Sequence, residues 1–227
     1  MGRAFKWFLG AGLAASLAFL GSGMARAAVT KIALLCGFEN QPQSGVQNLD
    51  PISVLSHPLT APNDYAWNTG GYASLTPFKK YATQGRTCAE VRFTTPLDFL
   101  SPGDKNHPLP STWEAGMTLS TDSATKLPVT DWSPYAELEV DVYNPGEEQY
   151  QPFLKVTDAY SHVTETAGYI KPKSKSVVSI PMSLLSQARL DLTNIQALTF
   201  YLNTARDTTD PVLYIDNVRL VPPKPGH

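Results

Sequence analysis

The stretch that most constrains the fold is 190–220, because it reads as two consecutive β-strands joined by a polar loop. Over 198–203 apolar and polar residues alternate, which is the period-two pattern of a half-buried strand. The second strand, 211–220, is rich in β-branched and aromatic residues, but its alternation breaks at Asp216-Asn217. We therefore predict a β-bulge at this pair, with either a bound ion or a satisfied hydrogen-bond network around it.

Short strand patterns separated by turn residues recur along the rest of the chain. About eight to ten strands are expected, among them 29–40, 88–99 and 137–143, with a short helical turn near 182–188. The chain has 19 prolines and almost no helical periodicity. This pattern is typical of an all-β fold, an antiparallel β-sandwich, and the length suits one domain over 28–221.

The N-terminus has the pattern of a secretory signal peptide. Arg3 and Lys6 precede an apolar stretch too short to span a membrane comfortably, and Ala25-Arg26-Ala27 is an A-x-A cleavage site. We therefore expect residues 1–27 to be removed and the protein to be secreted or periplasmic. A lipoprotein signal is the alternative, but the residue directly before Cys36 is not small.

Cleavage at this site removes three basic and no acidic residues, so the net charge changes from −2 to about −5. Nucleic acids and anionic membrane surfaces require basic patches, so neither is an expected partner. No later segment is apolar for long enough to cross a membrane. We expect a monomer that ends in a disordered tail at 222–227.

Two cysteines, Cys36 and Cys88, suggest one disulfide in an exported protein. A bridge between them would close a loop of about fifty residues and contribute roughly 3–4 kcal/mol on the chain-entropy model. The alternative is a pair of buried thiols. A catalytic thiol is not expected, because no histidine stands in a recognisable setting for one.

Three stretches, Phe38-Glu39, 131–146 and 190–220, together resemble the galactose-binding-like jelly-roll domains. More narrowly, they resemble the non-catalytic carbohydrate-binding modules attached to agarases and other bacterial polysaccharide hydrolases. The resemblance covers the chain well from Asp131 to Leu220, and in the first half only around Phe38-Glu39 and the strand that begins at Cys88. It implies a jelly-roll β-sandwich with a glycan as partner.

The same resemblance implies a structural calcium ion between the first and last strands. The matching carboxylates are Glu39 and Asp216, with loop carbonyls and waters as further oxygen ligands. The residues themselves leave a second interpretation open, in which Asp216 and Asn217 cap backbone groups at the bulge.

Glycan binding requires flat aromatic faces, which stack on sugar rings, and polar side chains that take the hydroxyl groups. Strands expected to share one sheet place the following side chains outward: Tyr143, Tyr201, Lys155, Asn203 and Asp141. Trp67 and Trp113, in polar segments, are each either a ligand platform or a loop anchor. Trp132 and Tyr135 precede a core strand, and we interpret them as a plug that closes one end of the sandwich.

We predict a non-catalytic module that binds a polysaccharide or glycoconjugate through an aromatic-bearing sheet face and its rim loops, with Tyr143 and Tyr201 exposed in a groove. The alternative is a structural or protein-interaction domain without a sugar site. A polysaccharide lyase or hydrolase is the third hypothesis, and its candidate carboxylates are Glu137, Glu139 and Asp141. The sequence has no zinc-binding, nucleophile-elbow, phosphate-loop or dinucleotide motif.

Overall fold

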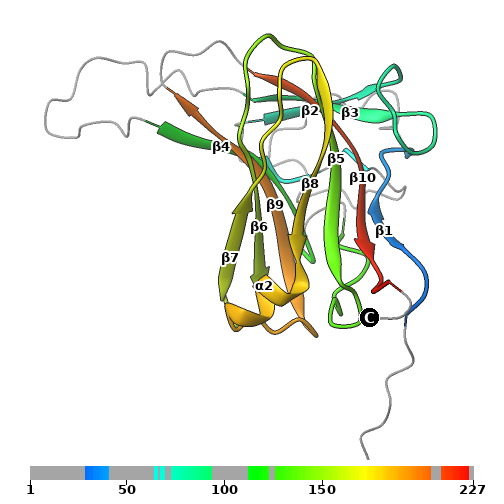
Figure 1. Cartoon of the computed structure of the whole chain (residues 1–227), viewed down its shortest axis with the longest axis vertical. Helices are drawn as coiled ribbons and strands as arrows, with labels where there is room; N and C mark the ends of the chain where they lie inside the picture. The colour runs from blue at the N-terminus through cyan, green and yellow to red at the C-terminus, as the bar shows by residue number, and fades with distance from the viewer. Residues whose placement is uncertain are drawn as a thin grey trace, which may run out of the picture.

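Two antiparallel sheets pack face to face in the computed structural model, which confirms the predicted β-sandwich (Figure 1). The structure describes residues 29–40, 64–65, 67–69, 73–93, 112–122, 126–205 and 211–224, without the side chains at 112–114 and 203–205. The predicted signal peptide at 1–27 and the last residues of the predicted tail lie outside this part of the chain. Within it, no helix is long and apolar enough to cross a membrane.

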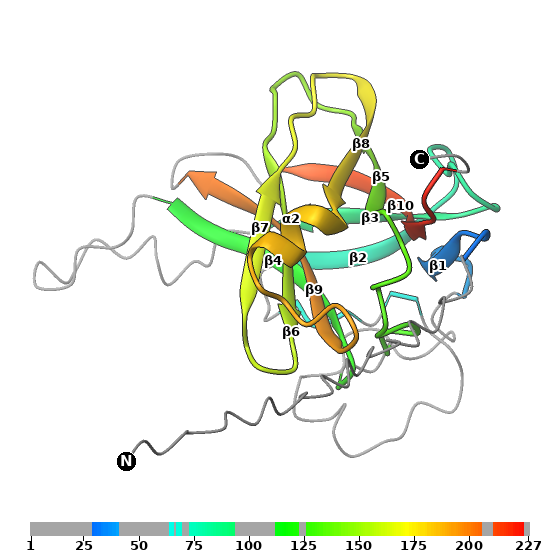
Figure 2. The same cartoon turned by 60° about the horizontal axis from the view of Figure 1, so that its bottom comes forward.

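The larger sheet, called sheet A here, has the strand order β2-β3-β10-β5-β8, with β1 also paired to β10. Its strands are β1 (Ala33–Cys36), β2 (Ala73–Phe78), β3 (Cys88–Phe93), β5 (Glu137–Asn144), β8 (Ser174–Pro181) and β10 (Val212–Val221). Sheet B has the order β4-β9-β6-β7. Its strands are β4 (Thr112–Ser120), β6 (Pro152–Asp158), β7 (Val163–Ala167) and β9 (Ile195–Ala205). The short helix α2 (Met182–Gln187) follows β8 and lies at one end of the sandwich (Figure 2).

The core lies between the two sheets and is filled by alternate residues of each strand. On β5 the buried set is Leu138, Val140 and Val142, and on β9 it is Leu198, Phe200 and Leu202. Both sets are those that the period-two patterns predict. Since successive side chains of a strand point to opposite faces, the residues between them form the outer face of each sheet.

Strand β10 is the centre of sheet A. It pairs with β5 along one edge, and along the other edge it pairs first with β3 and then with β1. The register with β5 shifts between Asp216 and Arg219, and Asn217 has a φ of 51°. The predicted bulge is therefore confirmed, and it falls where β3 ends its contact with β10 and β1 begins.

The expected disulfide is absent, because Cys36 and Cys88 are both free thiols in the structure. Cys36 belongs to the core, whereas Cys88 pairs with Phe78 and shares the outer face of β3 with Glu90. The two side chains therefore lie on opposite faces of sheet A, which is the physical reason that the prediction was wrong. Burial raises the pKa of Cys36 to about 12 and that of Cys88 to about 11, so both stay protonated and unreactive at neutral pH.

Trp132 is fully buried, and its indole N–H donates to the carbonyl of Val129 at 2.8 Å. Tyr135 is partly buried and packs against the same core. Both aromatic residues are therefore structural, and their role in closing one end of the sandwich stays a prediction.

A buried carboxylate, Asp158, holds together the connections at one end of sheet B. One oxygen accepts the backbone N–H groups of Tyr160 and His162 at 2.8 and 2.9 Å. The other accepts the backbone N–H of Asp191 at 2.8 Å and contacts the His162 ring at 2.9 Å. Burial alone would raise the pKa of Asp158, but these hydrogen bonds outweigh burial and lower it to about 2.

We predict that Asp158→Asn lowers the free energy of unfolding by about 2–4 kcal/mol at pH 7, because hydrogen bonds to the buried charge are lost. The folded pKa is below the unfolded value of about 3.9, so the stability due to this charge is present above about pH 4 and is lost as pH falls toward 2. Urea unfolding across this range should show the difference between wild type and variant shrinking with acidity. The control Asp122→Asn, at an exposed site, should unfold like wild type; a difference that is constant with pH would contradict this explanation.

Candidate functional site

The residues proposed for one site lie on two different sheets. Tyr143 and Asp141 are on β5 in sheet A, whereas Lys155 and Tyr201 are on β6 and β9 in sheet B. The outer faces of a sandwich point in opposite directions, so these four side chains cannot contact the same sugar ring. The expectation of one shared sheet was wrong, because strand alternation does not reveal which strands pair.

The two tryptophans proposed as ligand platforms, Trp67 and Trp113, lie in different settings. Trp67 is 5% exposed and stacks on Phe38 in the core, with ring centroids 6.0 Å apart. It is an anchor rather than a ligand platform. Trp113 lies in β4, opposite Thr204 of β9, and Asn203 is opposite Glu114, but these side chains lie outside the described part of the structure.

The outer face of sheet B, called the four-strand face here, follows from the register of its strands. One row crosses all four strands and consists of Ala167, Phe153, Tyr201 and Gly116. The next row consists of Glu165, Lys155, Thr199 and Thr118. The residues of each row lie directly opposite one another on neighbouring strands, so their side chains stand side by side on one surface.

Tyr201 is the centre of the four-strand face, but it is only 2% exposed. Its ring stacks on Phe153 at 4.9 Å, and Lys155 Nζ lies 4.6 Å from its centroid. Its hydroxyl donates to Glu165 Oε2 at 2.8 Å. Tyr201 therefore forms the floor of this face, which corrects the expectation that it stands exposed in a groove.

Gly116 lies opposite Tyr201, and its missing side chain lets β4 and β9 approach closely at this point. A Cβ at this position would overlap both the Cβ of Tyr201 and the backbone carbonyl of Phe200. The row thus has a small residue at each end, Ala167 and Gly116, and two aromatic rings between them.

Tyr169 is the exposed aromatic residue of the four-strand face, and sequence reasoning missed it. The pairs Phe153–Ala167 and Tyr150–Ile170 place Tyr169 opposite Gln151. Tyr169 is 65% exposed, and Gln151 Nε2 donates to its hydroxyl at 3.0 Å. The signal that could have found it is the period-two continuation of β7 beyond its last residue, Ala167.

Polar groups surround these rings. Lys155 Nζ lies 4.0 Å from Glu165 Oε2, and the hydroxyls of Thr118 and Thr199 are 2.9 Å apart. An ammonium, a carboxylate, an amide and two hydroxyls thus lie beside three aromatic rings. This combination of donors, acceptors and flat apolar faces matches a ligand that carries hydroxyl groups on an apolar ring.

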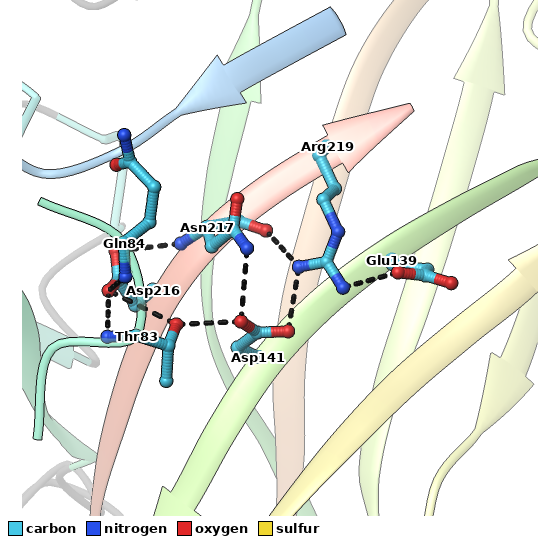
Figure 3. A network of polar contacts seen from close by, with 7 residues as sticks. All are labelled: Thr83, Gln84, Glu139, Asp141, Asp216, Asn217 and Arg219. Carbon is cyan, nitrogen blue, oxygen red and sulfur yellow. Dashed lines mark hydrogen bonds and ion pairs between the residues drawn. The ribbon is translucent and has the colours of Figure 1, made fainter. Parts of the chain in front are cut away.

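The outer face of sheet A carries a polar network built around the β10 bulge (Figure 3). Arg219 lies between the carboxylates of Asp141 and Glu139, donating to Asp141 Oδ1 at 2.7 Å and to Glu139 Oε2. The other oxygen of Asp141 accepts from Thr83 Oγ1 at 2.6 Å and Asn217 Nδ2 at 3.1 Å. Burial works to raise the pKa of Asp141, but these hydrogen bonds outweigh it and hold the pKa below its ordinary value.

Asp216 is buried and is satisfied by backbone donors. Its Oδ2 accepts the N–H groups of Thr83 and Gln84 at 2.6 and 2.8 Å, and its Oδ1 accepts the N–H of Asn217 at 2.7 Å. Burial raises the pKa of its carboxyl, and the amide hydrogen bonds offset only part of that increase. Of the two explanations for polar residues in this strand, the satisfied network describes the structure.

Glu39, the second carboxylate expected at calcium, contacts the same loop. Its Oε1 accepts the backbone N–H groups of Arg86 and Thr87 at 2.7 and 2.9 Å, and these lower its pKa. The recorded partners of Glu39 and Asp216 are all hydrogen-bond donors, and no cluster of three potential metal-binding side chains occurs among the described residues. Backbone N–H groups take carboxylate oxygens that a calcium ion would need, and calcium binding stays a prediction.

The carboxylates considered for catalysis lie side by side on β5. Glu139 and Asp141 are alternate residues of one strand and both bind Arg219. A glycosidase requires two carboxyl groups that flank the bond to be cleaved. The arrangement on β5 is that of an ion-paired surface instead.

Solved structures with a similar fold include an exo-beta-agarase, at 18% identity and a TM-score of 0.46, with 67% of this chain and 22% of that chain covered. Another is a family 11 carbohydrate-binding module from Clostridium thermocellum in complex with a beta-1,3-1,4-mixed-linked tetrasaccharide. It is 17% identical, with a TM-score of 0.42, and the match covers 69% of this chain and 89% of that chain. A family 30 module of a Clostridium thermocellum cellulosomal cellulase is 14% identical, with a TM-score of 0.44. The match covers 69% of this chain and 90% of that chain.

These are proteins of the kinds that the sequence resemblance indicates, and at such identities the likeness concerns the fold alone. The chain spans about a fifth of the length of the agarases it resembles, 22% and 23% for two of them. No protein-family model matches the chain, and the search of curated proteins gives no match.

We predict that Arg219→Met lowers the free energy of unfolding by about 2–3 kcal/mol, because two carboxylates that are largely shielded from solvent lose their cation. Arg92→Met is the matched control, since Arg92 is half-exposed and its ion pair with Glu90 is 3.5 Å long. The control should cost less than about 1 kcal/mol. If urea unfolding gives the same loss of unfolding free energy for Arg219→Met and Arg92→Met, the network around Arg219 stabilises the fold no more than a surface ion pair does.

Proposed function

We propose that this protein is a non-catalytic glycan-binding module that uses the four-strand face. The observation that carries the proposal is the line of aromatic rings across sheet B, from exposed Tyr169 through partly exposed Phe153 to the supporting ring of Tyr201. Such rings stack on the C–H faces of sugars. Rigid strands hold Phe153 and Tyr201 in place, so these two side chains lose little conformational freedom on binding.

The polar groups of this face give the ligand its orientation. Gln151 is held by Tyr169, and Lys155 and Glu165 lie around the hydroxyl of Tyr201. Lys155 and Glu165 lie on strands, Gln151 directly precedes β6, and these contacts already order the side chains before any ligand arrives. A neutral polysaccharide chain laid across β6 and β7 would meet aromatic faces and hydrogen-bonding groups in alternation.

The second candidate is a structural or protein-interaction domain, and the burial of Tyr201 favours it. This ring has its hydroxyl bonded and its face covered by Phe153 and Lys155, so it offers no free platform of its own. The glycan proposal therefore depends on Tyr169 and Phe153.

Further parts of the proposal rest on the sequence. We propose export through the signal peptide at 1–27 and a monomeric state, with a polysaccharide rather than nucleic acid as the partner. A role without catalysis is supported by the ion pairs of Glu139 and Asp141 with Arg219.

We predict that Tyr169→Ala and Phe153→Ala each weaken binding to a neutral glycan about tenfold, since each removes a stacking ring worth roughly 1–1.5 kcal/mol. Affinity electrophoresis in agarose, mixed-linkage glucan and xylan gels would measure this, with calcium and with EDTA. The melting temperature of Tyr169→Ala should equal that of wild type, because the ring is 65% exposed.

Tyr160→Ala is the matched control, since Tyr160 is 70% exposed but lies in the turn after β6. It should bind like wild type. If no glycan binds the folded protein in calcium or in EDTA, the structural alternative replaces this proposal. If binding survives both ring substitutions, the four-strand face is not the site.

A further inference from the structure

A second aromatic surface lies on the outer face of sheet A, on the other side of the sandwich from the four-strand face. It consists of Phe78, Tyr81, Tyr143 and Tyr214, called the tyrosine cluster here, and each of these side chains is partly exposed. None of the four packs against the core. The structure therefore keeps four large aromatic side chains at a solvent-facing surface, which calls for a ligand or a partner.

The rings of the tyrosine cluster pack closely against one another. Tyr143 and Tyr214 are opposite each other on β5 and β10, and Tyr81 lies over both, at centroid distances of 4.0 and 4.6 Å. Phe78 closes the cluster at 4.6 Å from Tyr214. Rings at these separations leave no slot for an inserted side chain, so the surface suits a ligand that lies flat on it.

Basic residues flank the tyrosine cluster on both sides. Lys80, in the connection after β2, has its Nζ 5.1 Å from the centroid of Tyr81. Lys175, on β8, is exposed and lies opposite Tyr143. In the described part of the chain, neither ammonium group has an ion-pair partner.

Within the described residues, each acidic side chain near the tyrosine cluster has a hydrogen-bond or ion-pair partner. Glu90 accepts the hydroxyl of Tyr214 at 3.0 Å and pairs with Arg92. Glu147 pairs with Lys173 at 2.6 Å. Asp141, two residues before Tyr143, is bound by Arg219, as described above. The surface therefore has two unpaired cations beside aromatic rings, on a protein whose net charge is −2.

We propose that the tyrosine cluster is a second binding site, for an anionic glycan that carries carboxylate or sulfate groups. A sugar ring would lie on Tyr81, the ring that covers Tyr143 and Tyr214, and the acidic groups would pair with Lys80 and Lys175. An acidic protein partner fits less well, because protein interfaces rely on side chains that insert into pockets, and the packed rings offer none. This site is independent of the proposed neutral-glycan site on sheet B.

The test uses the full chain and measures binding to polygalacturonate and to a sulfated galactan by titration calorimetry, beside neutral agarose oligosaccharides. Both acidic glycans should bind, and their affinity should fall about fivefold or more between about 50 and 500 mM NaCl, because exposed charges are screened. A Lys80→Ala/Lys175→Ala double variant should lose about tenfold in affinity for the acidic glycans. Its affinity for a neutral glycan should not change.

The matched control is Lys31→Ala/Lys126→Ala, which removes two exposed lysines outside the tyrosine cluster and should bind like wild type. Tyr81→Ala should weaken acidic-glycan binding, whereas Phe153→Ala should not.

The proposal is overturned if neither acidic glycan binds, or if the lysine double variant binds them as wild type does. Equally tight binding of polyglutamate or of single-stranded oligothymidylate would also overturn it, since charge alone would then suffice. If instead the sheet B proposal is wrong, the wild-type protein will not bind the neutral glycan, while its binding of the acidic glycans will still be as predicted here.

Discussion

The rest of this structure depends on how one strand, β10, satisfies its polar groups in the middle of a sheet. It is bound to β5 along one edge and to β3 and β1 along the other, so its bulge at Asp216 could not be exposed to water without opening the sheet. A buried carboxylate without partners would destabilise the fold by several kcal/mol. The backbone N–H groups of Thr83, Gln84 and Asn217 prevent this. The same contacts fix the loop after β2, and that loop carries Tyr81 over Tyr143.

The sandwich also decides which residues can act together. Each strand gives one row of side chains to the core and one to solvent, so each sheet has a single outer face. The outer face of sheet B gathers Phe153, Lys155 and Tyr201 with Tyr169 at its edge. The outer face of sheet A gathers Tyr81 and the tyrosines of β5 and β10 between Lys80 and Lys175, which have no ion-pair partner among the described residues. A ligand that binds one face does not reach the other, so the two proposed sites are independent of each other.

Sequence reasoning predicted the strands and their buried sides well, because alternation reports directly on which side of a strand meets the core. The rows of Leu138 and Leu198 are examples. It could not predict which strands pair, since pairing depends on contacts between distant segments, and so it placed Tyr143 and Tyr201 on one sheet. The predicted disulfide between Cys36 and Cys88 was wrong for a similar reason. An oxidising compartment and the length of the closed loop do not indicate on which face of a sheet each side chain lies. Tyr169 was missed although its spacing from Glu165 and Ala167 continues the outward row of β7.

The most direct test of the central claim, that the outer face of sheet B is the ligand face, is a backbone-amide NMR titration of the protein with a neutral oligosaccharide. The account predicts chemical-shift changes concentrated on β6, β7 and β9, around Gln151, Phe153 and Tyr169. Changes confined to sheet A, or to loops with β6 and β7 unaffected, would contradict it.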